Sequence, residues 1–320
     1  MTPQSTWRKI DDYPLFVMDT YEDYHFDRYL KTGILPLPPG FSLPAGGCSC
    51  FSAFNLPDQA IFGRNYDWTK NIPILLLFTH PANGYASASM VDLSLGFGTK
   101  EPSWKDPRDR QLLSLAPYIP LDGMNERGLT VALMKVPKAQ APSDPNKVNI
   151  IFLAAIRLML DKAQSVDEAI SLLGEYNITF IQQHFLIADA GGNSAIMEFV
   201  DGEIKVIRSK HPWQISTNFI LSDNLESPRT MCARYNTIDR TLEQTQGRIS
   251  TEKAMSLLKD VSQHGAVNTT IFSMIYNLIN GEIDIAVDRK FDRLYHYGLN
   301  MQKKRHTGLQ SGIRQHLRRV

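Results

Sequence analysis

The chain has 320 residues, of which 43% are hydrophobic and 21% charged, and its 34 basic residues are offset by 33 acidic ones. This composition is typical of a globular protein whose core is large enough not to depend on disulfide cross-links. A net charge near zero argues against a nucleic-acid-binding surface over the whole chain. Only residues 303–320 are clearly basic, and we expect them to form a solvated tail.

The chain carries three cysteines, Cys48, Cys50 and Cys232. An odd and small number argues against a disulfide framework, and no cysteine stands in a pattern with zinc-ligand spacing. Each is therefore either a small buried apolar residue or a nucleophile. The acidic N-terminus lacks the apolar stretch of a signal peptide, and no apolar run approaches the roughly 18 residues of a spanning helix. We therefore expect a cytoplasmic protein with no membrane partner.

The first half of the chain is predicted to be mostly β-structure after an N-terminal helix, which we expect within residues 11–31. Four prolines and four glycines in residues 32–47 exclude a long helix or a central strand and indicate an extended linker. Polar residues 99–111 are expected to form a loop. Strands are expected at residues 49–55, 60–66, 72–80, 85–93 and 129–136.

The second half alternates blocks of helices with blocks of strands. Ser165, followed three residues later by Glu168, is typical of a capping box at the start of a helix. Helices are expected at residues 149–160, 165–173, 229–244 and 251–261, and strands at residues 184–189, 194–200, 203–208, 270–276 and 283–287. Such blocks predict an α+β fold rather than an alternating Rossmann-type winding. Four layers, with helices outside two facing sheets, accommodate these elements in one domain.

Cys48 follows a glycine pair and opens a predicted strand, and the sequence FGRNYDW stands on the next strand. Cys48 lies 16 positions before Arg64 and 19 before Asp67. This arrangement resembles the choloylglycine hydrolase type of N-terminal nucleophile (Ntn) hydrolases, which includes bile salt hydrolases, penicillin V acylases and an isopenicillin N acyltransferase branch. In that family an N-terminal cysteine begins a strand, and an FGRNxD motif returns sixteen residues later. The spacing from Cys50 does not match, so the resemblance selects Cys48 as nucleophile.

Three further segments resemble this family in the same order along the chain. Residues 122–129, DGMNERGL, are similar to its DGMNEKGL turn. Residues 215–218, ISTN, are similar to a segment whose asparagine, here Asn218, serves the oxyanion hole. Residues 232–235, CARY, are similar to a helical segment whose arginine, here Arg234, enters the site. The resemblance covers residues 46–298 and implies a four-layer αββα Ntn-hydrolase sandwich of antiparallel sheets.

These residue types suit amide hydrolysis, which needs a nucleophile, a base and donors for the developing oxyanion. If the Gly47–Cys48 bond is broken, Cys48 carries a thiol and an α-amine whose reference pKa of about 8 suits a base near neutral pH. Arg64 favours the thiolate, and Asp67 holds the α-amine by a charge-assisted hydrogen bond. Arg234 orients Asp67 or the substrate. The reaction requires no cofactor and no metal.

Two features depart from the family pattern. The position ten residues after Asn125 lines the oxyanion hole in the relatives, where it is asparagine or tyrosine, and here it is Lys135. We therefore expect Lys135 and Asn125 near the substrate and oxyanion, Asn125 chiefly as a turn residue, and an anionic or polar acyl group instead of a bile salt or penicillin V. The second departure is the length of chain before Cys48. The sequence predicts a propeptide-like segment 1–47 released by autocatalytic cleavage after Gly47, an Ntn-hydrolase domain 48–302 and a basic tail 303–320.

The predicted function is hydrolysis of a linear, non-peptide amide bond in a small N-acyl substrate through an acyl-thioester on Cys48. An acyltransferase, in which an amine replaces water as acceptor, stays open as an alternative. A non-catalytic, unprocessed homologue whose residues 1–47 fill the pocket is a second alternative. A papain-like Cys–His pair is disfavoured because no histidine stands in a recognisable motif; the histidines considered are His80, His184, His211 and His264. A homo-oligomer is compatible with the resemblance, since relatives often form tetramers.

Overall fold

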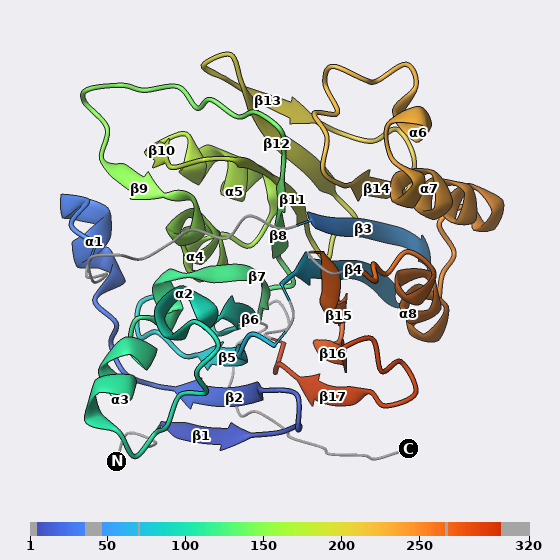
Figure 1. Cartoon of the computed structure of the whole chain (residues 1–320). Coiled ribbons are helices and arrows are strands. Elements are labelled where there is room, and N and C mark those ends of the chain that lie inside the picture. The colour runs from blue at the N-terminus through green and yellow to red at the C-terminus, as the bar shows by residue number, and fades with distance from the viewer. Residues whose placement is uncertain (1–4, 36–46, 70, 266–267, 302–320) are drawn as a thin grey trace, which may run out of the picture.

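The computed structural model describes residues 5–35, 47–69, 71–265 and 268–301 (Figure 1). Two large sheets face each other, and each carries helices on its outer side. Strand β3 of the smaller sheet packs against β8 and β11 of the larger one, and β12 packs against β14. This arrangement confirms the predicted α+β, four-layer αββα architecture.

The larger sheet has nine strands in the order β1-β2-β5-β6-β7-β8-β11-β12-β13. All neighbours are antiparallel except β2 and β5, which are parallel. Its central strands are buried on both faces because helices cover one face and the second sheet covers the other. The strands are β1 (Thr6–Lys9), β2 (Leu15–Thr20), β5 (Ile74–Thr79), β6 (Ser87–Asp92), β7 (Pro120–Asn125), β8 (Thr130–Lys135), β11 (Gln183–Ala188), β12 (Ser194–Val200) and β13 (Glu203–Ile207).

The smaller sheet has six antiparallel strands in the order β14-β3-β4-β15-β16-β17. Its centre is the β3–β4 hairpin, which carries the cysteine and the FGRNYDW motif. The strands are β3 (Gly47–Leu56), β4 (Gln59–Trp68), β14 (Trp213–Ser216), β15 (Thr269–Asn277), β16 (Glu282–Val287) and β17 (Tyr295–Gly298).

Four helices form the outer layers. On the larger sheet, α4 (Phe152–Lys162) packs on β7 and β8, and α5 (Val166–Leu173) on β11 and β12. On the smaller sheet, α7 (Ala233–Thr245) packs on β14 and β3, and α8 (Thr251–Asp260) on β4 and β15. In the part of the chain that the structure describes, none of the helices is both long and apolar enough to cross a bilayer. The remaining elements are α1 (Phe26–Thr32), α2 (Ser94–Phe97), α3 (Pro107–Leu113), the 3-10 turn η1 (Ala116–Tyr118), α6 (Pro228–Met231) and the parallel pair β9 (Asn149–Ile151) and β10 (Asn177–Thr179).

Residues 5–35 are built into the larger sheet and are not an appendage to it. All six residues of β2 are buried, and β2 lies between β1 and β5. After β2, the Tyr24 hydroxyl donates to Asp161 of α4 (2.6 Å), and the backbone N–H of Ile151 donates to the Tyr29 hydroxyl (2.9 Å). Residues on both sides of the predicted boundary after residue 47 therefore share one continuous hydrophobic core. Residues 36–46 of the predicted linker and the predicted tail 303–320 lie outside the described residues.

Two local predictions were wrong. The helix expected within residues 11–31 is confined to α1, because the apolar run of β2 suits a strand buried on both faces. The loop expected at residues 99–111 contains the start of α3. Asp106 caps that helix by accepting from the N–H of Arg108 (2.8 Å), and Pro107 occupies the first turn, where a proline is tolerated.

Candidate active site

The β3–β4 hairpin sets the geometry of the site. Cys48 is paired with Tyr66, and Gly47 with Asp67, across the two strands. Because side chains alternate along a strand, Cys48 and Cys50 point to the same face, and Arg64, opposite Cys50, points there too. The sixteen-residue spacing noted in the sequence therefore places the guanidinium of Arg64 next to the Cys48 thiol.

The Cys48 thiol lies in a buried, positively charged environment. Only 1% of Cys48 is exposed, and its Sγ lies 3.6 Å from Nη2 of Arg64, which is fully buried. Nη1 of Arg64 pairs with Asp122 at 2.9 Å and donates to the carbonyl oxygen of Leu121 at 2.6 Å. Tyr276 donates to the other oxygen of Asp122 at 2.7 Å. Asp122, the first residue of DGMNERGL, thus holds Arg64 under the thiol, a role that the sequence analysis did not assign to it.

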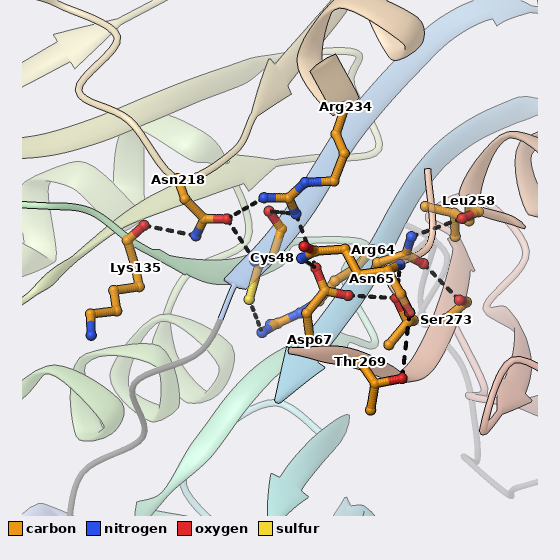
Figure 2. Close-up of polar contacts among 12 residues, drawn as sticks. Cys48, Arg64, Asn65, Asp67, Lys135, Asn218, Arg234, Leu258, Thr269 and Ser273 are labelled. Atoms are coloured by element: carbon orange, nitrogen blue, oxygen red, sulfur yellow. Dashed lines mark hydrogen bonds and ion pairs between the residues drawn. The ribbon is translucent and has the colours of Figure 1, made fainter. Parts of the chain in front are cut away.

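Asp67 and Arg234 meet beside the main chain of Cys48 (Figure 2). Nη1 of Arg234, from the first turn of α7, lies 3.0 Å from Asp67 and donates to the carbonyl oxygen of Cys48 at 2.7 Å. Thr270 donates to the other oxygen of Asp67 at 2.6 Å, and Gln263 also donates to this carboxylate. Burial raises the pKa of Asp67, and Arg234 is the strongest opposing influence. Thr270 and Gln263 were missed from the sequence, since no motif marks them.

Asn218 follows β14 and faces the same cysteine (Figure 2). Its Oδ1 accepts from the backbone N–H of Cys48 at 2.9 Å and from Nη2 of Arg234 at 2.7 Å. Its Nδ2 donates to the carbonyl oxygen of Lys135 at 2.8 Å. The structure thus brings Cys48, Arg64, Asp67, Asn218 and Arg234 into one cluster, from segments that lie up to 186 positions apart in sequence.

Lys135 and Asn125 contribute less directly than expected. Lys135 contacts the cluster through its carbonyl oxygen, and in Figure 2 its side chain runs away from Asn218 and Cys48. Asn125 shapes a turn, since its Oδ1 accepts from the N–H groups of Arg127 (3.0 Å) and Leu129 (3.1 Å). Its Nδ2 donates to two carbonyl oxygens at the C-terminal end of α4. Asn125 therefore supports the strand connection and does not line the cluster.

Gly47 occupies a position with little room for a side chain. A Cβ placed there would lie 3.0 Å from Nε2 of Gln263 and 3.5 Å from Oδ1 of Asn218. Both atoms belong to groups that contact Asp67 or Cys48. A side chain at position 47 would crowd Gln263 and Asn218, so glycine before the cysteine preserves the contacts around the Gly47–Cys48 bond.

Three of the four histidines considered for a papain-like mechanism have other partners. His184 is buried on β11 and hydrogen-bonded to Glu198 and to the carbonyl oxygen of Thr217. His80 stacks on Tyr21, and His211 stacks on Trp213. The contacts of Cys48 thus favour activation by Arg64 over activation by a histidine.

We expect replacement of Arg64 by leucine to destabilise the fold strongly. The Arg64–Asp122 pair is fully buried, and removing one partner leaves an uncompensated charge, which typically costs about 3–5 kcal/mol. Urea unfolding followed by circular dichroism measures this loss. The double variant Arg64→Leu/Asp122→Leu should recover part of it; a double variant less stable than Arg64→Leu would contradict the pairing.

We expect alkylation of Cys48 to be slow at neutral pH in chains that retain the Gly47–Cys48 bond. Burial raises the pKa of the Cys48 thiol, and Arg64 opposes the effect only in part. Since the thiolate is the reactive form, labelling by iodoacetamide should accelerate above about pH 8.5. Partial burial raises the pKa of Cys232, but a hydrogen bond from the Tyr235 backbone and the charge of Arg234 outweigh it, so Cys232 should label at lower pH. Peptide mass spectrometry across pH separates the two, and equal pH profiles would contradict this assignment.

Comparison with known proteins identifies a matching family and similar folds. Residues 118–292 match the family model described as acyl-coenzyme A:6-aminopenicillanic acid acyl-transferase. The match includes Asn218 and Arg234 but begins after the β3–β4 hairpin, so it does not include Cys48, Arg64 or Asp67.

A curated relative, penicillin V acylase from Pectobacterium atrosepticum, is 25% identical over 179 residues, which are 51% of this chain and 46% of the relative. The matched region thus spans about half the length of that protein. Among solved structures, penicillin V acylase from Agrobacterium tumefaciens superimposes with a TM-score of 0.58 at 16% identity, covering 80% of this chain and 88% of the other. A variant of the conjugated bile acid hydrolase from Clostridium perfringens superimposes with a TM-score of 0.59 at 15% identity, covering 84% and 97%.

The two structures establish the shared Ntn-hydrolase fold, and the family model matches more than half of the chain. The protein therefore belongs to the acyl-coenzyme A:6-aminopenicillanic acid acyl-transferase family.

Proposed function

We propose that this protein is a cysteine Ntn amidohydrolase that cleaves the linear amide bond of a small N-acyl substrate, with Cys48 as nucleophile. The observation that carries the proposal is the clustering of the thiol, N–H and carbonyl oxygen of Cys48 with Arg64, Asn218 and Arg234, respectively. The penicillin V acylase and bile acid hydrolase among the similar proteins support an amide as substrate.

The first proposed step frees the α-amine of Cys48. Its Sγ attacks the carbonyl carbon of Gly47, the thiol proton passes to the departing nitrogen of Cys48, and a thioester joins Gly47 to the sulfur. Water then hydrolyses this thioester, which leaves a carboxylate on Gly47 and a free thiol and amine on Cys48. The close packing around Gly47 supports this step, because it holds the Gly47–Cys48 bond next to Asn218 and Asp67.

In the proposed reaction cycle the α-amine removes the thiol proton, and the thiolate, stabilised by Arg64, attacks the substrate carbonyl. One amide hydrogen of Asn218 binds the carbonyl oxygen of Lys135, and we assign the other to the developing oxyanion. Asp67 and the Asn218 Oδ1 hold the amine in place. The amine's proton passes to the leaving nitrogen, and water then releases the acyl group from the sulfur.

Intact mass and a substrate panel test the proposal. Purified protein should contain a C-terminal chain that begins at Cys48, and it should hydrolyse at least one member of a panel of penicillin V, glycine-conjugated bile salts, N-acyl amino acids and N-acyl homoserine lactones. Amidase activity from a single uncleaved chain would overturn the mechanism. The prediction of an anionic or polar acyl group, made from Lys135, is tested by the same panel.

A second candidate function is acyl transfer, which the description of the matching family favours. The two reactions share the acyl-thioester and differ only in whether water or an amine resolves it. Adding a nucleophilic amine such as 6-aminopenicillanic acid to the hydrolysed substrate distinguishes them: a transfer product that replaces the free acid favours the acyltransferase. A folded protein whose Cys48 neither cleaves the chain nor reacts with a thiol probe would instead favour the non-catalytic alternative.

A further inference from the structure

A buried histidine–carboxylate pair lies behind the proposed oxyanion hole, and the mechanism above does not use it. His184 on β11 is 1% exposed, and Glu198 on the neighbouring strand β12 is fully buried. Their side chains contact each other, with Nδ1 of His184 3.2 Å from Oε1 of Glu198. Burying two such groups costs free energy unless hydrogen bonds satisfy them.

The partners of this pair all belong to the segment that carries Asn218. Nε2 of His184 lies 2.8 Å from the carbonyl oxygen of Thr217, the residue just before Asn218, and 2.8 Å from the hydroxyl of Ser216. On the other side, Glu198 accepts from the N–H of Leu221 at 2.6 Å and from that of Ser222 at 3.0 Å. The larger sheet therefore fixes the backbone of segment 216–222, which starts at the last residue of β14, both before and after Asn218.

Each of these contacts needs a donor on one side and an acceptor on the other. Burial alone would raise the pKa of Glu198, but hydrogen bonds from His184 and Ser222 outweigh it and hold that pKa below its ordinary value. Glu198 is thus an acceptor for every group that faces it. The carbonyl oxygen of Thr217 is also an acceptor only, so His184 lies between two acceptors, one at each ring nitrogen. A neutral side chain of another shape can form only some of the hydrogen bonds that link Glu198, His184 and Thr217.

We propose that Glu198 and His184 are positioning residues that hold segment 216–222 so that the Asn218 carboxamide is aimed at Cys48, an inference that rests on the proposed function. Asn218 binds the Cys48 N–H through its Oδ1, and in the proposed mechanism its Nδ2 supplies an N–H to the oxyanion. A displacement of about 1 Å at such a group costs on the order of 100-fold in rate, because the oxyanion donor no longer meets the developing charge.

The substitution Glu198→Gln tests this role while nearly preserving the volume of the side chain. We expect the N–H groups of Leu221 and Ser222 to exchange with deuterium about tenfold faster or more in this variant, since a carboxamide offers one acceptor in place of two. We expect kcat for penicillin V, or for the best substrate of the panel, to fall about 100-fold, with KM changed less than about threefold.

Asp189→Asn is the matched control. Asp189 is also a buried carboxylate of the β11–β12 hairpin and accepts from the backbone N–H groups of Val166 (3.0 Å) and Gly191 (2.9 Å). It lies at the end of β11 opposite to the end that pairs with Lys135. This control should lose stability without changing exchange in segment 216–222 or kcat. Unchanged exchange in Glu198→Gln, or an equal fall of kcat in Asp189→Asn, would overturn the inference.

A pair of histidine variants tests the Thr217 contact separately. His184→Gln places an amide nitrogen near the former Nε2 and can still donate to the Thr217 carbonyl oxygen, whereas His184→Asn places it near the former Nδ1 and cannot. We expect the glutamine variant to retain at least tenfold more kcat than the asparagine variant. Equal kcat values in the two variants would show that His184 does not position the segment. If the wild-type chain neither cleaves nor hydrolyses the panel, the proposed function fails, and the exchange measurement still decides whether Glu198 holds the segment.

Discussion

Replacing Cys48 by alanine is expected to leave the Gly47–Cys48 bond intact and to lower amidase turnover by about 10⁴-fold or more, because the nucleophile of both reactions is removed. The fold should survive, since Arg64 keeps its bonds to Asp122 and Leu121 when the sulfur is gone. Intact mass measures cleavage, and hydrolysis of the panel measures turnover.

Cys50→Ala is the matched control for this prediction. Cys50 is buried on the same face of β3, two residues further along, and is paired with Arg64 across the hairpin. Its substitution removes a thiol of the same kind from the same core, and cleavage and turnover should persist. Loss of both activities in Cys50→Ala, or their persistence in Cys48→Ala, would reverse the assignment of the nucleophile.

The segment before Cys48 is expected to stay bound after cleavage and to be required for folding. Strand β2 is buried in all six residues and covers β5, whose apolar edge would otherwise be open to pairing with other chains. We expect native mass spectrometry to find the two fragments together and denaturing mass spectrometry to find them apart. A chain expressed without residues 5–35 should give no cooperative unfolding transition and should aggregate.

A milder variant tests the same interface in a chain that folds. Tyr24→Phe removes the hydroxyl that donates to Asp161, whose charge is also held by the buried Arg157. Leaving one buried acceptor short of a partner typically costs about 1–3 kcal/mol. Urea should then release residues 1–47 from the cleaved protein at a lower concentration than in wild type. Loss of this fragment from wild type on native gel filtration would contradict the prediction.

Local patterns in the sequence predict the hairpin, while the family resemblance selected Cys48 and Arg64. Their placement on one face also depends on an irregularity between Ala53 and Leu56, which shifts the strand register by one residue and which no sequence motif marks. The apolar blocks also predict the α+β class, because each block matches the period of its element. Asn218 and Arg234 were selected by resemblance, and the structure brings both to Cys48. Their catalytic roles stay predictions that the variants above test.

The remaining features of the site depended on how one sheet packs against the other. Gln263, His184 and Glu198 carry no local signal, because each acts through a partner that is remote along the chain. Asp122 opens the DGMNERGL motif, but its pairing with Arg64 emerges only in the structure. The N-terminal segment illustrates the same limit: its run before α1 is apolar enough for a helix or a strand, and only parallel pairing with β5 decides between them. The sequence alone is enough to predict the hairpin from its β-type runs and short turn, and the family resemblance is enough to select Cys48 and Arg64. What surrounds them depends on the tertiary structure, because burial and charge at the site are set by contacts between sheets, which local periodicity does not encode.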